Sequence, residues 1–251
     1  MKTLFPEKTA FLATVLSAEE SKEALYAGAS VIDVKNPAEG ALGAASPKVI
    51  ASVRQVIPKE IHLSAAIGDM PYLPGTAALA ALGAAKAGAT IIKVGLLGTK
   101  TTEEVFLLLQ ATASALADHC PKTALVAGAY ADAKDFSGVD PLEIPAAAAS
   151  AGAAGCLLDT FDKMSGRRLP DVLSFKKIEV FLASCSEAGL FSALAGSLGP
   201  GDIARLLSLK PHFLGFRGAL CEGGRSGRFS FERTKEIARL IEGEDICSPR
   251  I

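Results

Sequence analysis

The feature that most constrains the fold of this chain is a strand-like apolar run that recurs about every thirty residues. The runs are at residues 10–17, 30–35, 61–68, 90–98, 123–130, 155–160, 190–198 and 212–220. They are continuously apolar, which is typical of strands covered on both faces in a parallel sheet. Eight strand–helix units in 251 residues predict a single (β/α)₈ TIM barrel of the class I aldolase type over residues 1–251.

The segments between these runs have helical periodicity and recognisable ends. Ser17 with Glu20, and Thr101 with Glu104, have the spacing of a capping box at a helix start. Gly28 is placed to end the first of these helices. Further helices are predicted at residues 77–87, 146–151, 174–189, 201–209 and 233–243.

The main alternative to a barrel is an open, doubly wound parallel sheet. Such a sheet favours a GxGxxG turn after its first strand, where a dinucleotide phosphate binds. The corresponding stretch of this chain, VLSAEES, contains no glycine. No change of composition along the chain marks a second domain. A barrel therefore accounts for the sequence better.

Charge and cysteine content exclude several classes of function. The 26 basic and 27 acidic residues give a net charge of -1, so we expect no nucleic-acid or membrane partner. The apolar stretches lack the length of a membrane span, and the N-terminal stretch lacks the pattern of a signal peptide. The five cysteines, Cys247 included, form no CxxC pair, which argues against a disulfide framework or a zinc site. We expect a cytoplasmic protein.

Charged residues occur at the carboxyl ends of the strands, where barrel enzymes place their active sites. Asp33 and Lys35 end the second strand and share a face, because they are two residues apart. Lys93 lies in the fourth strand, and Asp159 ends the sixth, with Lys163 four positions later. Alternate strands of a barrel contribute to the same interior layer. The sequence therefore predicts one layer in which three lysines and two aspartates meet.

Stability alone is a poor explanation for such a layer. A single lysine in a strand usually extends its amine to solvent, but buried ion pairs stabilise weakly because desolvation consumes the Coulomb gain. A buried lysine near other cations has a lowered pKa, so its neutral amine can attack a carbonyl and form a Schiff base. A neighbouring lysine or carboxylate can then transfer protons. The spacing does not decide which lysine is the nucleophile.

Other chemistry has less support. The three histidines are isolated from one another, so we expect no metal site and no cofactor. The loops after the seventh and eighth strands, in contrast, contain glycines and arginines that suit a phosphate dianion. Barrel enzymes often bind phosphate in these two loops. The candidate phosphate ligands are Gly196, Ser197, Arg217 and Gly218, with Gly223, Gly224 and Arg225 beyond them. The predicted substrate is a phosphorylated carbonyl compound.

Seven motifs follow one another along the chain in the order DVKNPAEGALGA, IGDMPYLPGT, IKVGL, AGAYADA, LLDTFDK, LAGSL and GFRGALC. Together they resemble the (5-formylfuran-3-yl)methyl phosphate synthase family, also called 4-(hydroxymethyl)-2-furancarboxaldehyde-phosphate synthase. The resemblance covers nearly the whole chain. It implies a lyase of methanofuran biosynthesis with an aldolase-like barrel. The substrate would be two molecules of glyceraldehyde 3-phosphate, joined with loss of phosphate and water into a phosphorylated furan aldehyde.

The resemblance also implies roles for the charged residues. Lys35, in DVKNP, would be the Schiff-base lysine, and Lys93, in IKVGL, would be the proton acceptor. Asp33, Asp159 and Lys163 match the supporting acid–base positions. Because a lysine accepts a proton only when it is neutral, we expect Lys93 to have a lowered pKa.

Two other functions stay open. One is a different Schiff-base aldolase, or an isomerase like triose-phosphate isomerase, acting on a sugar phosphate. The other is a barrel that binds a sugar phosphate without turning it over. The alanine-rich helices pack closely and favour a homo-oligomer, with no indication of its symmetry.

Overall fold

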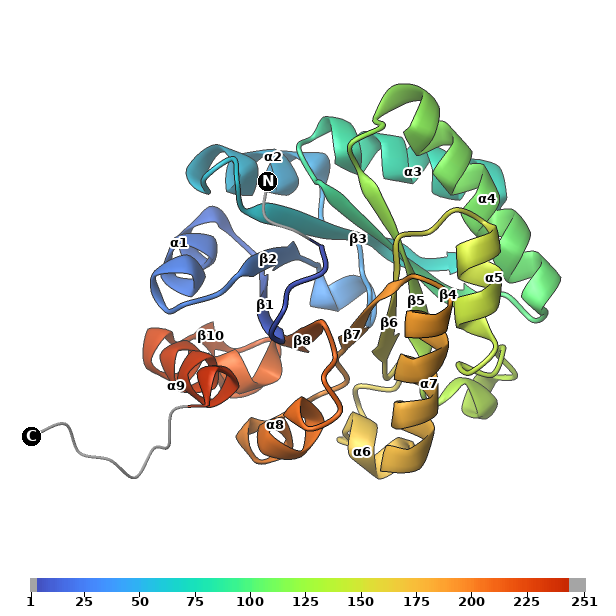
Figure 1. Cartoon of the computed structure of the whole chain (residues 1–251). Helices are drawn as coiled ribbons and strands as arrows, with labels where there is room; N and C mark the ends of the chain where they lie inside the picture. The colour runs from blue at the N-terminus through green and yellow to red at the C-terminus, as the bar shows by residue number, and fades with distance from the viewer. Residues whose placement is uncertain (1–3, 244–251) are drawn as a thin grey trace, which may run out of the picture.

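Eight parallel strands close into a barrel, as the sequence predicted, and helices surround it (Figure 1). The computed structural model describes residues 4–243. The strands are β1 (Ala10–Val15), β2 (Val31–Val34), β3 (His62–Pro71), β4 (Ile91–Gly98), β5 (Ala124–Tyr130), β6 (Gly155–Asp159), β7 (Phe191–Leu194) and β8 (Phe213–Phe216). Each strand pairs with the next in the chain, and β1 pairs with β8 to close the ring. The predicted TIM barrel is confirmed.

The helices alternate with the strands and cover the outside of the barrel (Figure 1). They are α1 (Ala18–Tyr26), α2 (Pro47–Val56), α3 (Pro74–Lys86), α4 (Thr102–His119), α5 (Ile144–Ser150), α6 (Leu169–Val172), α7 (Phe175–Glu187), α8 (Pro200–Leu207) and α9 (Phe231–Glu242). Short 3₁₀ turns lie at η1 (Pro37–Glu39), η2 (Ala133–Phe136) and η3 (Gly218–Leu220). In the described part of the chain, no helix is long and apolar enough to cross a membrane.

Two predicted capping boxes are only half formed. Ser17 accepts a hydrogen bond from the Glu20 N–H at 3.2 Å, and Thr101 accepts one from the Glu104 N–H at 3.1 Å. Neither glutamate carboxylate reaches back to the cap residue itself. Each accepts instead from the N–H one position earlier, which for Glu20 is that of Leu16 at 2.8 Å. The side chains still satisfy backbone donors that the first helical turn leaves open.

Two helices and one hairpin were missed in the sequence. Helix α2 starts at Ser46, whose hydroxyl accepts from the Val49 N–H, with Pro47 in the first turn. That Ser-Pro pair is a helix-start signal and could have identified it. Helix α6 and the hairpin of β9 (Cys221–Glu222) and β10 (Arg228–Phe229) are too short to produce a periodic pattern.

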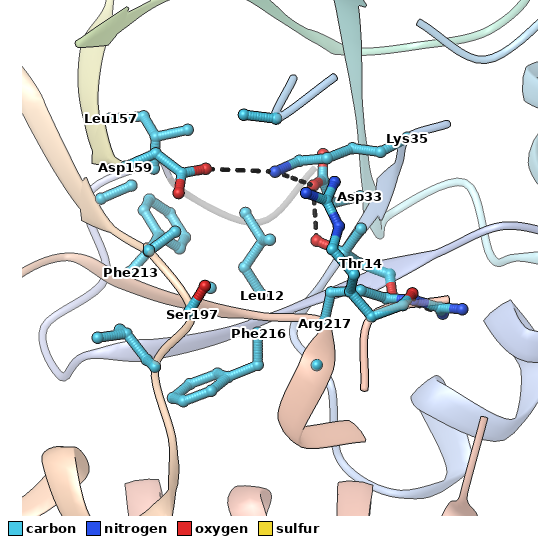
Figure 2. A pocket seen from close by; sticks show the side chains of 18 of the residues that line it. Leu12, Thr14, Asp33, Lys35, Leu157, Asp159, Ser197, Phe213, Phe216 and Arg217 are labelled. Atoms are coloured by element: carbon cyan, nitrogen blue, oxygen red, sulfur yellow. Dashed lines mark hydrogen bonds and ion pairs between the residues drawn. The ribbon is translucent and has the colours of Figure 1, made fainter. Parts of the chain in front are cut away.

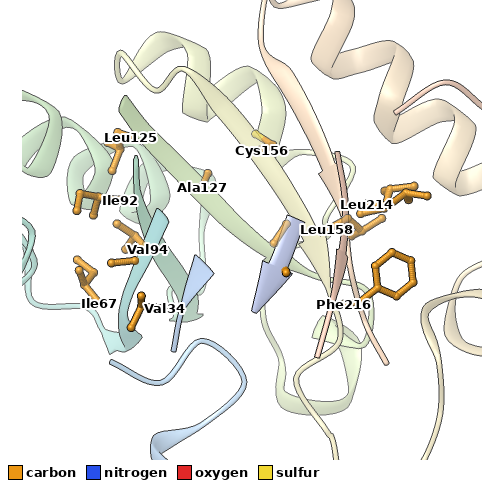
Figure 3. Close-up of a cluster of buried hydrophobic side chains, with 14 of the residues drawn as sticks. Val34, Ile67, Ile92, Val94, Leu125, Ala127, Cys156, Leu158, Leu214 and Phe216 are labelled. Carbon is orange, nitrogen blue, oxygen red and sulfur yellow. The ribbon is translucent and has the colours of Figure 1, made fainter. Parts of the chain in front are cut away.

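Apolar side chains fill two shells, one on each side of the strands. The outward-facing residues of the strands pack under the helices, as Figure 3 shows for Ile92, Leu125, Leu158 and Leu214. The inward-facing residues belong to a second cluster, which includes Val31, Ile91, Val126, Leu157, Phe191 and Phe213. This double burial explains why the strands read as continuous apolar runs. The buried Cys156, Cys185 and Cys221 belong to the outer shell, whereas Cys247 lies outside the described residues.

Helix α7 provides a direct test of the outer shell. Phe181 is fully buried, while its neighbour Val180 is 40 % exposed. We expect Phe181→Ala to lower the free energy of unfolding by about 3–5 kcal/mol, because it removes a large buried ring and leaves a cavity. Val180→Ala should change it by less than about 0.5 kcal/mol. Urea unfolding followed by circular dichroism measures both values, and similar losses in the two variants would contradict this packing.

Candidate active site

A cavity of about 390 Å³ lies at the carboxyl ends of the strands and extends down into the barrel. Of the site residues predicted from the sequence, all except Gly223 line it. The ones that do are Asp33, Lys35, Lys93, Asp159, Lys163, Gly196, Ser197, Arg217, Gly218, Gly224 and Arg225. Apolar side chains of the inner cluster form its floor. Polar groups therefore converge at the top of a largely apolar chamber, which is the usual make-up of a small-molecule site.

Three lysines and two aspartates form a chain of alternating charge across this cavity. Lys93 Nζ lies 2.5 Å from Asp33 Oδ1, and Lys35 Nζ lies 4.0 Å from Asp33 Oδ2. On its other side, Lys35 Nζ lies 3.5 Å from Asp159 Oδ2, and Lys163 Nζ lies 2.5 Å from Asp159 Oδ1. Figure 2 shows the Lys35 amine pointing between the two carboxylates. Lys35 is thus the central cation of the five groups.

These charges occupy two levels of the barrel, so the prediction of one layer is wrong. Across β3, Asp33 is in register with Ile91, which is two residues before Lys93. In a barrel with the stagger of the TIM type, an advance of two residues over two strands keeps the same height. Asp33 and Lys93 therefore share one level, and Lys35 and Asp159 share the next level up. The long lysine side chains span the step between levels.

Small residues separate the two charged levels. They come from the odd-numbered strands, and the same register argument places Thr14, Ala66, Gly128 and Ala195 there. None of them has a side chain long enough to fill the centre of the barrel. Space for a bound substrate is therefore left between the charges above and below.

Burial and neighbouring charges act in opposite directions on these groups. Burial disfavours the ionised carboxylates, but Lys93 and Lys35 outweigh it at Asp33, whose pKa lies below its usual value. Lys163 and Lys35 do the same for the pKa of Asp159. For Lys93, burial outweighs the attraction of Asp33 and lowers the pKa to about 8. A fraction of this amine, about a tenth, is therefore neutral at pH 7.

Threonines fix the two carboxylates. The Thr14 hydroxyl donates to Asp33 Oδ2 at 2.9 Å, and the Thr160 N–H donates to Asp159 Oδ1 at 2.8 Å. Lys163 Nζ also donates to the Thr160 hydroxyl at 3.0 Å. Neither threonine was identified in the sequence, because threonine is common in strands. Their positions beside the charged residues at strand ends were the only available signal.

Arg217 lines the cavity, but its guanidinium is paired with a carboxylate from α1. Its Nη1 lies 2.5 Å from Glu20 Oε2, and its Nη2 lies 3.2 Å from Glu20 Oε1. Nη1 also donates to the Thr14 carbonyl at 3.3 Å. Through Glu20 and the Thr14 carbonyl, Arg217 holds the end of β8 against α1 and the end of β1. A role for Arg217 as a phosphate ligand stays a prediction.

The turn after β7 needs glycine for steric reasons. Gly196 has φ +102°, and a Cβ there would lie 2.9 Å from Leu169 Cβ. Ser197 follows with φ 54°, also in the left-handed region. Two successive residues with positive φ turn the backbone sharply along the wall of the cavity. This turn suits an anion-binding loop.

A second pair of polar side chains, not identified in the sequence, lies beside the charged chain. The Tyr130 hydroxyl donates to Asp69, and the Leu42 N–H donates to the same carboxylate at 3.3 Å. Burial raises the pKa of Asp69. A Cβ at Gly95 would lie 2.7 Å from both polar groups, so only glycine fits there. The pair ties the segment after β2 to β3 and β5.

The histidines contribute nothing to this cavity. His62 Nδ1 contacts the Thr90 hydroxyl at 3.2 Å, and His212 Nδ1 accepts from the Ser192 N–H at 3.1 Å. His119 is exposed at the end of α4. Over residues 4–243, no group of three or more His, Cys, Asp or Glu side chains is placed to hold a metal ion.

Several solved structures share this fold at low sequence identity. Phosphoribosyl anthranilate isomerase from Thermus thermophilus aligns with a TM-score of 0.65 at 15 % identity, over 94 % of this chain and 100 % of that one. A 3-hexulose-6-phosphate synthase aligns with a TM-score of 0.64 at 16 % identity, over 92 % of this chain and 99 % of that one. At such identities the likeness concerns the barrel fold alone.

Closer relatives share the sequence itself. A protein of Methanothermobacter thermautotrophicus named (5-formylfuran-3-yl)methyl phosphate synthase is 41 % identical over 233 residues, which are 92 % of this chain and 98 % of the relative. Proteins of the same name from Methanococcus aeolicus and Methanocaldococcus jannaschii are 44 % and 42 % identical, over 89 % and 92 % of this chain and 96 % and 99 % of theirs. The model of the 4-HFC-P synthase family matches residues 11–238. Because this match covers all but the first residue of the eight-stranded barrel and includes all five residues of the lysine–aspartate chain, the chain belongs to the 4-HFC-P synthase family.

Proposed function

We propose that this chain joins two molecules of glyceraldehyde 3-phosphate into 4-(hydroxymethyl)-2-furancarboxaldehyde phosphate through an imine on Lys35. One phosphate and two waters leave in the overall reaction, and the product serves methanofuran biosynthesis. Family membership supports the substrate and the product. The observation that carries the mechanism is the position of the Lys35 amine between two buried carboxylates.

Lys35 is the best placed of the three lysines to act as nucleophile. Lys93 and Lys163 each lie 2.5 Å from a carboxylate, whereas Lys35 is held more loosely, at 3.5 and 4.0 Å. The side chain of Lys35 is 10 % exposed, against 4 % for Lys93 and 12 % for Lys163, so the looser ion pairing of Lys35, and not its exposure, distinguishes it from Lys163. The Lys35 amine is thus the freer one to attack an aldehyde carbon. Asp159 and Asp33 are close enough to accept and return the protons of imine formation.

Lys93 is the base in this proposal. Once the imine forms at C1 of the triose, the C2–H bond becomes acidic, because the imine accepts its electron pair to give an enamine. Neutral Lys93 takes the C2 proton, and its lowered pKa makes the neutral form available. The enamine then expels the phosphate from C3, which leaves with the C3–O electron pair. Addition to the second triose, ring closure and dehydration follow.

The remaining polar groups have supporting roles. Lys163, bound to Asp159 and Thr160, is placed to protonate departing oxygen atoms. The turns at Gly196–Ser197 and Gly218 suit a substrate phosphate, and Arg217 shapes this wall through Glu20. The homo-oligomer and the cytoplasmic location expected from the sequence stay predictions.

Incubation with glyceraldehyde 3-phosphate tests the proposal. We expect an ultraviolet-absorbing furan aldehyde, release of inorganic phosphate, and a mass gain on Lys35 after borohydride reduction. A trapped lysine without a furan product would indicate another Schiff-base aldolase. Isomerised triose with no trapped lysine would indicate enediol chemistry. Substrate binding with neither product nor trapping would indicate a non-catalytic barrel, and each of these three outcomes contradicts the proposal.

A further inference from the structure

The β9–β10 hairpin places one arginine over the mouth of the cavity. Its tip begins with Gly223 and Gly224, whose φ values of +80° and +83° turn the chain back toward the barrel. Arg225 follows them and lines the cavity. Its Nη2 donates to the carbonyl of Gly40, in the segment after β2, at 2.9 Å. Arg225 therefore reaches from the loop after β8 across to the loop after β2.

The charge of Arg225 is not balanced by a paired carboxylate. In the described part of the chain, no aspartate or glutamate oxygen lies within 4.0 Å of its guanidinium, whereas Arg217 has Glu20. Asp159 and Asp69 attract its charge, and Arg217 repels it. The side chain is half-buried. A partly desolvated guanidinium without a counter-ion is stabilised by an anionic ligand.

Arg225 also has two guanidinium nitrogens whose N–H groups are available to a ligand. The bond to Gly40 uses Nη2, and within residues 4–243 its Nε and Nη1 donate to no protein acceptor. Phosphate oxygens suit such a planar pair of donors, because two parallel hydrogen bonds can form. Lys163 lies close enough for its pKa to be affected by the charge of Arg225. The two cations border the same part of the cavity.

We propose that Arg225 forms a second phosphate subsite, which binds the phosphate of one of the two trioses. This inference rests on the proposed function, because that reaction brings two phosphorylated molecules into one cavity. The Gly196–Ser197 turn on the β7 side serves one phosphate, and the hairpin tip serves the other. Two dianions repel each other, so a cation between the loops after β8, β2 and β6 offsets that repulsion.

Substitutions at Arg225 test the subsite, with Arg228→Gln as a matched control. Arg228 belongs to the same hairpin but is exposed and does not line the cavity. We expect Arg225→Gln to weaken the binding of inorganic phosphate, measured by titration calorimetry, by about tenfold or more. The concentration of glyceraldehyde 3-phosphate that half-saturates furan formation should rise by a similar factor. Arg225→Lys should lose less, and Arg228→Gln should match the wild type.

Borohydride trapping with D-glyceraldehyde shows whether Arg225 binds the substrate phosphate or only holds the loop in place through Gly40. This aldehyde has no phosphate, so Arg225→Gln should leave its borohydride trapping on Lys35 unchanged. If Arg225→Gln reduced trapping equally with glyceraldehyde 3-phosphate and with D-glyceraldehyde, the inference would be overturned. Arg225 would then act only through its bond to Gly40. Unchanged phosphate binding in Arg225→Gln would also overturn it. A wild type that binds phosphate through Arg225 but makes no furan would refute the proposed function alone.

Discussion

Replacing Lys35 with alanine is expected to abolish the borohydride-trapped adduct and to lower furan formation by roughly 10⁴-fold or more, because the covalent step is lost. Lys35→Arg keeps the positive charge between Asp33 and Asp159 but cannot form an imine, so it should be equally inactive. The measurements are the mass of the reduced protein and the initial rate of furan absorbance.

Lys48→Ala is the control for the Lys35 variants. Lys48 is exposed at the start of α2, in the same strand–helix unit, and it should behave as the wild type. Both Lys35 variants should remain folded, because each carboxylate keeps another lysine 2.5 Å away. If Lys35→Ala still gained mass on reduction and a Lys163→Ala variant did not, the nucleophile would be Lys163.

The second large effect is expected at Lys93. In the proposed mechanism its neutral form is the active one, so the rate should rise as the pH increases through the pKa of about 8 and then level off. Lys93→Gln should lower the rate by about 10²–10⁴-fold, because the proposed general base is lost. It should also remove the rise of the rate with pH, which is the rising limb of the pH–rate profile. Initial rates measured between pH 6 and pH 10 check both statements. A rising limb that survives in Lys93→Gln would show that a different group is the base.

Asp33→Asn tests the direction in which the rising part of the pH–rate profile moves. Burial lowers the pKa of Lys93, and the charge of Asp33 opposes that lowering. Removing the charge should therefore lower the pKa further and move the rising limb to lower pH. The rate at the plateau should fall as well, because the ion pair that positions the amine is lost. A limb that moves to higher pH would contradict the assignment of the limb to Lys93.

Much of the barrel could be predicted because its signals are local. Each strand is a short apolar run, and helix starts such as Ser17 and Thr101 follow directly after strands. The short helix α6 and the two-residue strands of the hairpin left no such signal, since periodicity needs more residues than they contain. The proposed assignment of Lys35 as nucleophile and Lys93 as base came from the family resemblance of their motifs, because spacing alone did not separate the three lysines.

The sequence by itself determined the eight-stranded barrel and the set of charged residues at its carboxyl end. Only the tertiary structure decided how these charges pair. The stagger of the strands splits them over two levels, and this depends on register around the whole ring. Arg217 meets Glu20 across 197 positions of the chain, and Arg225 meets Gly40 across 185. No local sequence pattern predicts such contacts, because they form only when β8 closes the barrel against β1 and β2.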